Sequence, residues 1–160
     1  MVGSQAFEQM VENLPIGVMT CDLKDFTINY LNKFSRETFK KLEHLLPCRA
    51  DQVMGICIDG FHKDPAHQRA ILKDPNRLPY QSNIRLGDEI LDLLVSPIFD
   101  DAGNYVAPMA TWSIVTDRIK AEEESLRQAQ MIDQMPVNVM FMEPENFTIT
   151  YMNQTSLDTL

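Results

Sequence analysis

The chain has 160 residues, 44% of them hydrophobic and 23% charged, which is the composition of a globular protein with one real core and part of another. Its formal net charge of −9 argues against nucleic acid and anionic lipid as partners, because both require clustered Lys and Arg. No apolar run approaches the roughly 20 residues that cross a bilayer, and no signal peptide is evident, so no direct membrane insertion is expected. Cys21, Cys48 and Cys57 form no CxxC pair, which favours buried thiols in a reducing cytoplasm.

The first third of the chain predicts a hairpin between two helices. The β-prone text FTINYL alternates in polarity and follows a short apolar stretch and a polar turn, as in a hairpin. Asn32 or Ser35 can cap the helix that follows. The predicted elements are a short amphipathic helix over 6–13, strands over 17–21 and 26–31, and a helix over 35–46.

The next segment, residues 55–72 (GICIDGFHKDPAHQRAIL), carries two of the three histidines. An Asp-Gly pair marks a turn, and Pro65 suits the first turn of a helix. We therefore expect His62 on a short irregular or 3₁₀ turn and His67 inside the helix that follows. An imidazole in that position can turn inward to a cavity; the alternative is a surface histidine in a polar turn.

Three antiparallel strands are predicted next, and a charged helix ends this part of the chain. In the last strand Trp112 shares a face with small side chains, which leaves room for a ligand unless the indole is ordinary core filler. The charged helix has few apolar residues and is either a short coiled-coil seam or a solvated spacer, with Asp117 as its cap. The predicted strands cover 80–86, 90–97 and 105–116, and the helix covers 118–130.

The text of residues 10–39 returns at residues 131–160. Met131 lies 121 residues after Met10, and this offset holds without a gap. The repeat predicts a domain over 6–117, a linker helix over 118–130 and the truncated start of a second domain of the same type over 131–160. A piece of about 30 residues cannot bury a core alone, so we expect it to pair with another chain or with the first domain.

The sequence resembles a PAS domain. The carrying text is GICIDGFHKDPAHQR, then DPNRLPY, then LDLLVSPIFDDAGNYVAPMATWSIVTD, which is similar to the haem-binding PAS domains of soluble oxygen-sensing bacterial chemoreceptors, the methyl-accepting chemotaxis proteins. The resemblance implies an α+β fold, with a five-stranded antiparallel sheet, short helices on one side and flanking helices at both ends. It also implies a tandem, cytoplasmic signal-transduction protein and a homodimer that acts on a downstream signalling domain.

The resemblance also implies a set of site residues. His62 is the axial ligand of the iron of haem b, with His67 as the second choice. Trp112 donates to bound oxygen or a related diatomic gas, and Leu93 crowds the same side. Lys63 and Arg69 are candidates for the propionates. Beside the resemblance, the inward faces of the strands predict the rest of the pocket: Ile84, Leu91, Ala110 and Ile114 as its sheet wall and Phe61, Ile71 and Leu72 as candidates for its helical side.

The physical requirements of haem agree with these residue types. Haem needs an apolar cleft and one strong axial nitrogen, and the second ring nitrogen of the imidazole should bond a carbonyl or water. An indole N–H is a donor only, so Trp112 does not compete for the iron.

Two other readings stay open. One is a flavin-binding (FAD) redox sensor, and the other is a cofactor-free dimerisation and relay domain with contacts through 6–13 and 118–132. No nucleophile–base pair or phosphate loop is evident, so we expect no enzyme, and no cysteine pair accompanies the histidines at zinc-site spacing.

Overall fold

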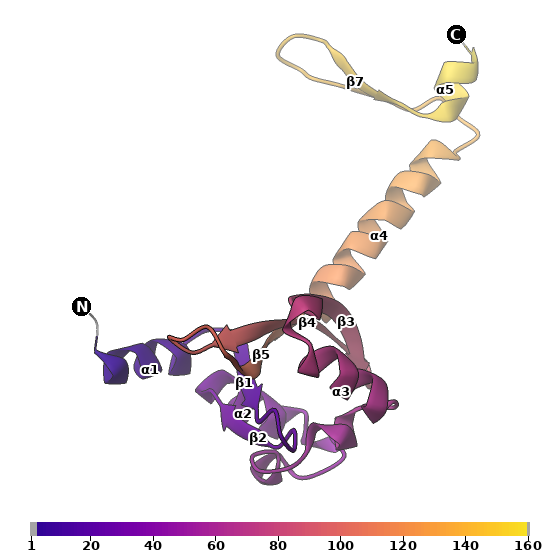
Figure 1. Ribbon diagram of the computed structural model, residues 1–160. Helices are drawn as coiled ribbons and strands as arrows, with labels where there is room; N and C mark the ends of the chain where they lie inside the picture. The colour runs from indigo at the N-terminus through magenta and orange to yellow at the C-terminus, as the bar shows by residue number, and fades with distance from the viewer. Residues whose placement is uncertain (1–2, 160) are drawn as a thin grey trace. The chain divides into compact units, whose positions relative to one another are not determined.

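An antiparallel sheet of five strands dominates the first of the two units into which the chain divides (Figure 1). The computed structural model describes residues 3–159; unit 1 ends at Val115 and unit 2 begins at Thr116. The strand order in unit 1 is β2-β1-β5-β4-β3. The strands are β1 (Gly17–Cys21), β2 (Ile28–Leu31), β3 (Tyr80–Leu86), β4 (Glu89–Phe99) and β5 (Tyr105–Ile114).

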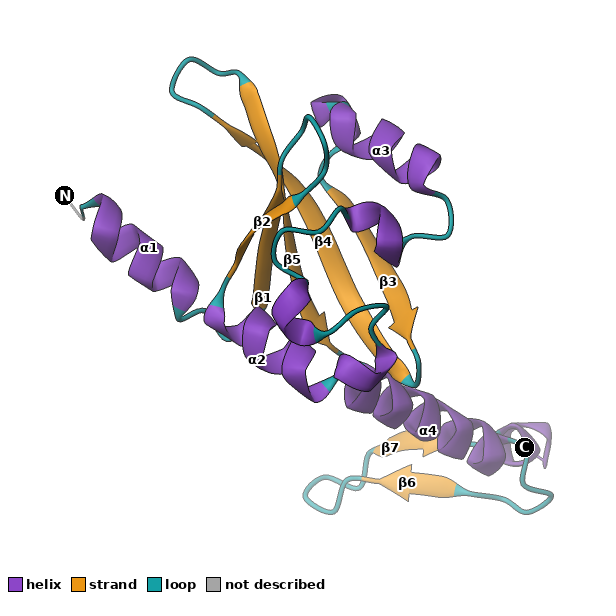
Figure 2. Ribbon diagram, turned by 90° about the horizontal axis from the view of Figure 1, so that it is seen from below, coloured by secondary structure: helices purple, strands orange, loops and turns teal. Residues whose placement is uncertain are grey.

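Helices α2 and α3 and the short turns between them lie on one face of this sheet (Figure 2). The α+β architecture expected from the sequence, with a five-stranded antiparallel sheet and short helices on one side, is therefore confirmed. Helix α1 precedes the sheet in the chain. The helices of unit 1 are α1 (Ser4–Glu12), α2 (Lys33–Lys41) and α3 (Pro65–Lys73), with 3₁₀ turns η1 (Glu43–Leu45), η2 (Ala50–Gln52), η3 (Ile58–Phe61) and η4 (Pro75–Arg77).

The core lies between the helices and the inner face of the sheet, because alternate residues of each strand point to that face. On β4 the inward residues Leu91 and Val95 are buried, and on β5 Trp112 is buried. The helical side contributes apolar side chains from α2, α3 and the turns. The cluster is Cys21, Phe26, Ile28, Leu31, Phe39, Val53, Ile58, Ile71, Leu72, Leu78, Leu91, Val95 and Trp112.

Asn32 ties the first hairpin to the helices on either side. It is fully buried, and its Oδ1 accepts from the backbone amides of Val18 and Ser35, each at 3.0 Å. Its Nδ2 donates to the carbonyl of Ile16 at 2.9 Å. Of the two predicted caps for α2, Asn32 is therefore the one that performs this role.

Two predicted boundaries in this region are wrong. The second strand begins at Ile28 rather than at Phe26, because Phe26 has a φ of 61°, which removes it from the strand. The helix predicted over 35–46 ends at Lys41 and is followed by the separate turn η1.

Unit 2 consists of a long helix, a hairpin and a short helix after the hairpin. Helix α4 begins at Thr116, before Asp117, so Asp117 lies in the first turn of the helix and is not its cap. Among the described residues no helix is both long and apolar enough for a membrane span. The elements of unit 2 are α4 (Thr116–Asp133), β6 (Met140–Met142), β7 (Ile149–Met152) and α5 (Gln154–Thr159).

Candidate functional site

His62 lies at the junction between η3 and α3, as the sequence predicts. It follows the η3 turn directly as its C-cap residue, with extended backbone angles. Two residues later Asp64 caps α3, accepting from the amide of His67 at 3.0 Å, and Pro65 occupies the first turn. The imidazole is thus carried on a short segment that is fixed at both ends.

The His62 ring is oriented by a backbone carbonyl. Its Nδ1 lies 2.8 Å from the carbonyl oxygen of Ile58. A carbonyl can only accept, so Nδ1 must carry the proton, and Nε2 is left as a free acceptor in the neutral ring. This is the arrangement that a metal-ligating histidine uses, since the bond at the second nitrogen fixes the tautomer and the ring direction.

The cavity that His62 borders lies between the sheet and α3. It measures about 60 Å³ and is lined mostly by apolar side chains. The sheet and the helical segment both contribute to its wall. The sheet contributes Met19, Thr20 and Cys21 of β1, Leu93 and Val95 of β4, and Pro108 and Ala110 of β5. The helical side contributes Ile58 of η3, His62 between η3 and α3, and Gln68 and Leu72 of α3.

The volume of this cavity decides what fits without movement. About 60 Å³ accommodates a few water molecules or one small gas molecule. Pockets for larger ligands measure roughly 300–1,000 Å³. His62 is the side chain that would hold a haem iron, because its Nε2 is left as an acceptor once Nδ1 is bonded. The cavity is several times smaller than a porphyrin requires, so haem would bind only after the helical side had moved away from the sheet.

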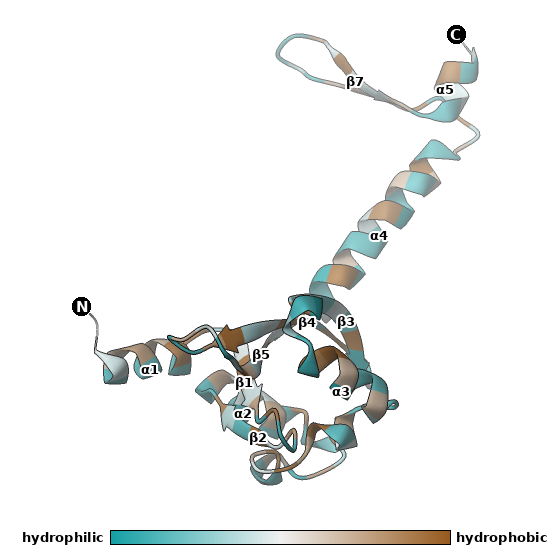
Figure 3. Cartoon of the chain, in the orientation of Figure 1, coloured by the Kyte–Doolittle hydropathy of each residue, from teal (hydrophilic) through white to brown (hydrophobic). Residues whose placement is uncertain are grey.

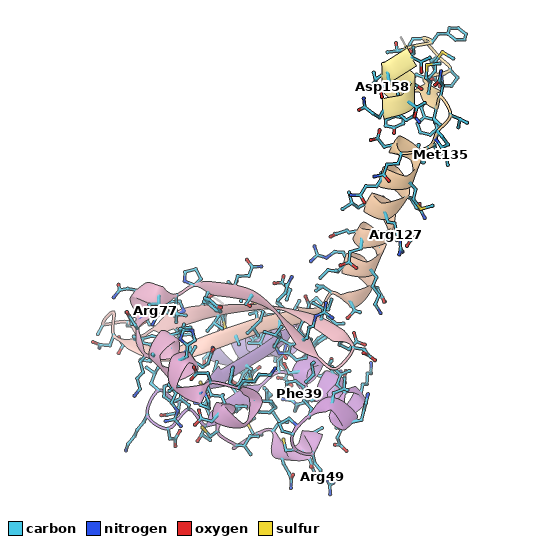
Figure 4. All side chains as sticks on the ribbon, turned by 90° about the vertical axis from the view of Figure 1, so that its right-hand side faces the viewer. Phe39, Arg49, Arg77, Arg127, Met135 and Asp158 are labelled. Atoms are coloured by element: carbon cyan, nitrogen blue, oxygen red, sulfur yellow. The ribbon has the colours of Figure 1, made fainter. Side chains whose placement is uncertain are left out.

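Trp112 is buried on the inner face of β5, but its indole does not line the cavity. The ring stacks on Phe39 (labelled in Figure 4), with centroids 5.1 Å apart, and meets Phe34 edge-on at 5.9 Å. Within the described residues its Nε1 is buried and finds no hydrogen-bond acceptor. A buried donor without a partner destabilises the folded state, so an acceptor that reached this N–H would bind favourably.

Some of the other predicted wall residues line the cavity, and others lie in the core beside it. Leu93, Ala110 and Leu72 line the cavity. Leu93 pairs directly with Trp112 across β4 and β5, which places it beside the indole. The core residues Leu91 and Ile71 are buried away from the cavity lining, and Phe61 packs against the same core.

Ile84 and Ile114 are corrections to the predicted pocket. They are 42% and 40% exposed, so neither forms part of the wall. Ile84 lies on β3, the edge strand of the sheet, and Ile114 is the last residue of β5. Both pair with the inward-facing Leu91, so alternation gave the correct face of each strand but not how deeply each side chain is buried.

His67, the second choice as ligand, is exposed on α3. Lys63 is exposed as well. Arg69, a candidate for the propionates, instead donates two hydrogen bonds to Asp59, from Nε to Oδ1 at 3.0 Å and from Nη2 to Oδ2 at 2.6 Å. This pair joins η3 to α3, and the bond from Arg69 holds the pKa of Asp59 below its usual value.

Several lining residues were missed by the sequence argument. Val95 and Pro108 continue the inward faces already recognised on their strands, so the alternation pattern could have identified them. The bulge between Thr20 and Cys21 places consecutive residues of β1 on the lining, which no periodicity predicts. Gln68 carried no distinguishing signal.

Cys21 also borders the cavity, as a neutral thiol. Burial, with a smaller effect of Cys57, raises its pKa to about 12. A thiol is a metal ligand only as the thiolate, so Cys21 does not compete with His62 near neutral pH. Among residues 3–159 no three His, Cys, Asp or Glu side chains gather as a metal site; an iron held by a porphyrin needs only one axial side chain.

Comparison with known proteins identifies relatives of this chain. A family model described as "PAS domain" matches residues 5–74. The methyl-accepting chemotaxis protein McpB of Pseudomonas aeruginosa is 32% identical over 119 residues, 71% of this chain, and the chain spans 17% of the length of that relative. A structure from the Aer2 receptor of Vibrio cholerae, titled a dual PAS-haem oxygen sensor, is 32% identical with a TM-score of 0.60 and covers 66% of this chain and 99% of its own.

More distant structures share the fold alone. A PAS domain from Colwellia psychrerythraea is 17% identical, with a TM-score of 0.51, and the match covers 71% of this chain and 97% of that one. An RNA-binding light-oxygen-voltage receptor is 16% identical, with a TM-score of 0.52, and the match covers 79% of this chain and 37% of that one.

Proposed function

This chain belongs to the PAS domain family, and on that premise we propose that unit 1 is a haem-binding sensor of a diatomic gas in a protein of the chemoreceptor type. The Aer2 structure, 32% identical and matched over nearly its whole length, is a dual PAS-haem oxygen sensor, and McpB is a chemotaxis protein. Haem, when bound, supplies an iron centre to which a diatomic gas can attach.

The observation that carries the proposal is the orientation of His62. Its Nδ1–H is held by the carbonyl of Ile58 at 2.8 Å, and the ring borders the cavity between α3 and the sheet. The remaining nitrogen, Nε2, is free to act as an axial ligand. A bond at one ring nitrogen fixes the tautomer and the ring direction of a metal-ligating histidine.

Trp112 supports the gas-binding part of the proposal. A buried indole N–H without an acceptor can serve a polarised gas molecule, because such a molecule offers an acceptor. Leu93, opposite Trp112 in the strand pairing, lines the cavity and sets how much room the gas has. To reach the cavity the indole must turn from its present stack on Phe39.

The route for a signal follows the chain. Trp112 lies two residues before the end of β5 at Ile114, and α4 begins at Thr116. A change in the hydrogen bonding of the indole thus acts on a strand that continues almost directly into the exit helix. We propose that this change in hydrogen bonding shifts a downstream signalling domain of a homodimeric receptor between two states. The size of the shift is set by the difference in the affinity of the two states for the gas.

Titration of the 160-residue protein with haemin, followed by absorption spectroscopy, tests the proposal. We expect a six- or five-coordinate haem spectrum that changes in His62→Ala and is unchanged in His67→Ala, because His67 is exposed. Trp112→Phe should release the gas about tenfold faster, the equivalent of one lost hydrogen bond. An unchanged spectrum in His62→Ala would reject the ligand assignment.

The cavity volume favours a second candidate, a PAS domain that relays signals without a cofactor. Side chains occupy most of the space between the sheet and α3 and leave a cavity of only about 60 Å³. This candidate predicts a colourless purified protein that takes up no haemin. A yellow protein with flavin absorption would point to FAD instead, and the one spectrum distinguishes all three outcomes.

A further inference from the structure

Two carbonyls of the η3 turn hold His62. The backbone amide of His62 donates to the carbonyl of Asp59 at 3.1 Å, and its ring nitrogen Nδ1 lies 2.8 Å from the carbonyl oxygen of Ile58. Both the backbone and the ring of the histidine are thus bonded to consecutive residues of one turn. The direction of the free nitrogen, Nε2, is therefore set by where η3 lies.

Asp59 is also the residue at which α3 is attached to this turn. Its carboxylate accepts two hydrogen bonds from the guanidinium of Arg69, at 3.0 Å from Nε and at 2.6 Å from Nη2. A pair with two parallel bonds fixes the orientation of the two planar groups as well as their distance. Asp59 therefore bonds Arg69 with its side chain and His62 with its carbonyl.

The guanidinium of Arg69 is itself fixed by contacts with the first hairpin and the segment beside it. Its Cζ lies 5.0 Å from the centre of the Phe26 ring, and Nη2 donates to Sγ of Cys57 at 3.4 Å. Phe26 is 0% exposed, and Cys57 pairs with Thr27 in an isolated bridge. One side chain thus links α3, η3 and the hairpin.

Helix α3 gives Arg69 a fixed backbone from which to extend. Ile71 and Leu72 are buried in the core, whereas Arg69 is half-buried and Lys73 is exposed. Figure 3 shows hydrophobic and hydrophilic residues following one another along this helix. The buried side chains hold the helix, so the reach of Arg69 toward Asp59 is set by packing.

We propose that Arg69 is the positioning residue of the iron ligand: through Asp59 it holds η3 so that the His62 ring borders the cavity with Nδ1 protonated and Nε2 free. Arg69 is absent from the described residues that line the cavity, so it acts through Asp59. The role of His62 as an iron ligand rests on the function proposed above. The orientation of its ring can be measured without haem.

The arrangement requires an arginine. A guanidinium is planar, bonds both oxygens of a carboxylate and stacks on an aromatic ring, whereas the ammonium of lysine is a compact point charge. Lys73 illustrates the difference on the same helix: its Nζ lies 5.8 Å from the centre of the Phe26 ring. Within the described part of the chain Asp59 forms its ion pair with Arg69 and not with Lys73, which makes Lys73 a matched control cation.

Nitrogen NMR of the 160-residue protein, labelled with ¹⁵N in its histidine rings, tests the proposal without haem. Spectra are recorded at pH 8, where imidazoles are neutral and each ¹⁵N shift reports whether that nitrogen carries the proton. We expect one tautomer, Nδ1–H, for His62 in the native protein and in Lys73→Gln, assigned by the signal missing from His62→Ala. In Arg69→Gln, Arg69→Lys and Asp59→Asn the ring should exchange between both tautomers, so its two ¹⁵N shifts move toward each other.

Asn32→Ala separates positioning from a general loss of stability. Asn32 bonds the first hairpin and α2 rather than η3, so its loss should lower the urea midpoint of unit 1 and leave the His62 tautomer unchanged. A single tautomer that persists in both Arg69→Gln and Asp59→Asn overturns the proposal. Loss of the single tautomer in Asn32→Ala or Lys73→Gln overturns it as well.

Titration of the same variants with haemin separates this role from a direct contact with the propionates. Positioning predicts that Arg69→Gln and Asp59→Asn both weaken haem binding, by about 10–100-fold, the usual effect of disturbing the partner of a ligating histidine. A propionate contact predicts instead that Asp59→Asn frees Arg69 and leaves the affinity equal or higher, a result that overturns positioning. If the native protein takes up no haemin, the function proposed above fails, and the tautomer spectra still decide whether Arg69 orients His62.

Discussion

The indole of Trp112 lies directly against the α-carbon of Gly17, its partner across β1 and β5. A β-carbon at position 17 would come within 2.1 Å of Cε2 and 2.3 Å of Nε1 of the indole. Glycine is thus required at this position by the ring and not by its backbone angles. The other neighbour of the ring is Phe39, on which it stacks with centroids 5.1 Å apart.

Gly17→Ala should therefore displace the Trp112 ring and destabilise unit 1 by about 1–3 kcal/mol, the usual cost of overpacking a core. Trp112 is the one tryptophan of the chain, so urea unfolding followed by its fluorescence reports on unit 1. Gly60→Ala is the matched control, because a β-carbon at position 60 would meet nothing within 4 Å. Equal midpoints for the two variants would contradict the contact.

Asn32→Ala should cost unit 1 about 3 kcal/mol. The substitution leaves the buried amides of Val18 and Ser35 without an acceptor, and each unsatisfied buried group costs about 1–3 kcal/mol. The same urea experiment measures the loss. Asn29→Ala is the control, since Asn29 is exposed and its side-chain oxygen accepts from the hydroxyl of Thr20 at 2.6 Å, near the surface. A loss below about 1 kcal/mol for Asn32→Ala would show that water replaces the side chain.

The pair between Asp59 and Arg69 predicts a dependence of stability on acid. The bonds from Arg69 hold the pKa of Asp59 below its usual value, so the folded state favours the carboxylate. This contribution is complete above the unfolded pKa of about 3.9 and is lost as the pH falls through the lower, folded value. Asp59→Asn should therefore have a lower urea midpoint than the native protein at pH 7, and the difference should vanish in acid.

Asp51→Asn is the control for that experiment. Asp51 pairs with Arg49 at 3.0 Å, but their side chains are 60% and 71% exposed, and such pairs contribute little. Its midpoint should follow the native protein at every pH. A constant difference between Asp59→Asn and the native protein, from neutral pH into acid, would mean that the charge of Asp59 is not the cause.

Alternation along the strands predicted most of the sheet, because one side of each strand is buried. The pattern gave the inward faces of β4 and β5 but not their coverage, so Ile84 and Ile114 were placed in a wall that ends before them. Coverage depends on where the helices stop, and no local pattern encodes that.

Phe26 shows a signal that was present but not used. Phe26 is the aromatic that begins the β-prone text FTINYL and so favours a strand, yet its φ is 61°. Asp25 precedes it and accepts from the amide of Thr27 at 2.9 Å; in the repeat Asn146 does the same for Thr148 at 2.9 Å. An Asp or Asn at that place in both copies indicates a turn around the phenylalanine.

The position of His62 was predictable, whereas its hydrogen bond and the cavity were not. A turn followed by Pro65 is enough to place a histidine ahead of a helix. The bond to Ile58 depends on how tightly η3 winds, and the volume of about 60 Å³ depends on how side chains from β1, α3, β4 and β5 meet. Both are properties of packing between distant segments.

Tyr105→Phe should loosen α3, the helix that lines the cavity beside His62. The hydroxyl of Tyr105 donates to the carbonyl of Leu72 at 2.7 Å and so ties the end of α3 to β5, and burial raises its pKa to about 12. Loss of this bond should cost about 1 kcal/mol and speed amide exchange in α3. Tyr80→Phe is the control, because Tyr80 is 39% exposed at the start of β3. If α3 exchanges equally fast in both variants, the hydroxyl of Tyr105 does not restrain it.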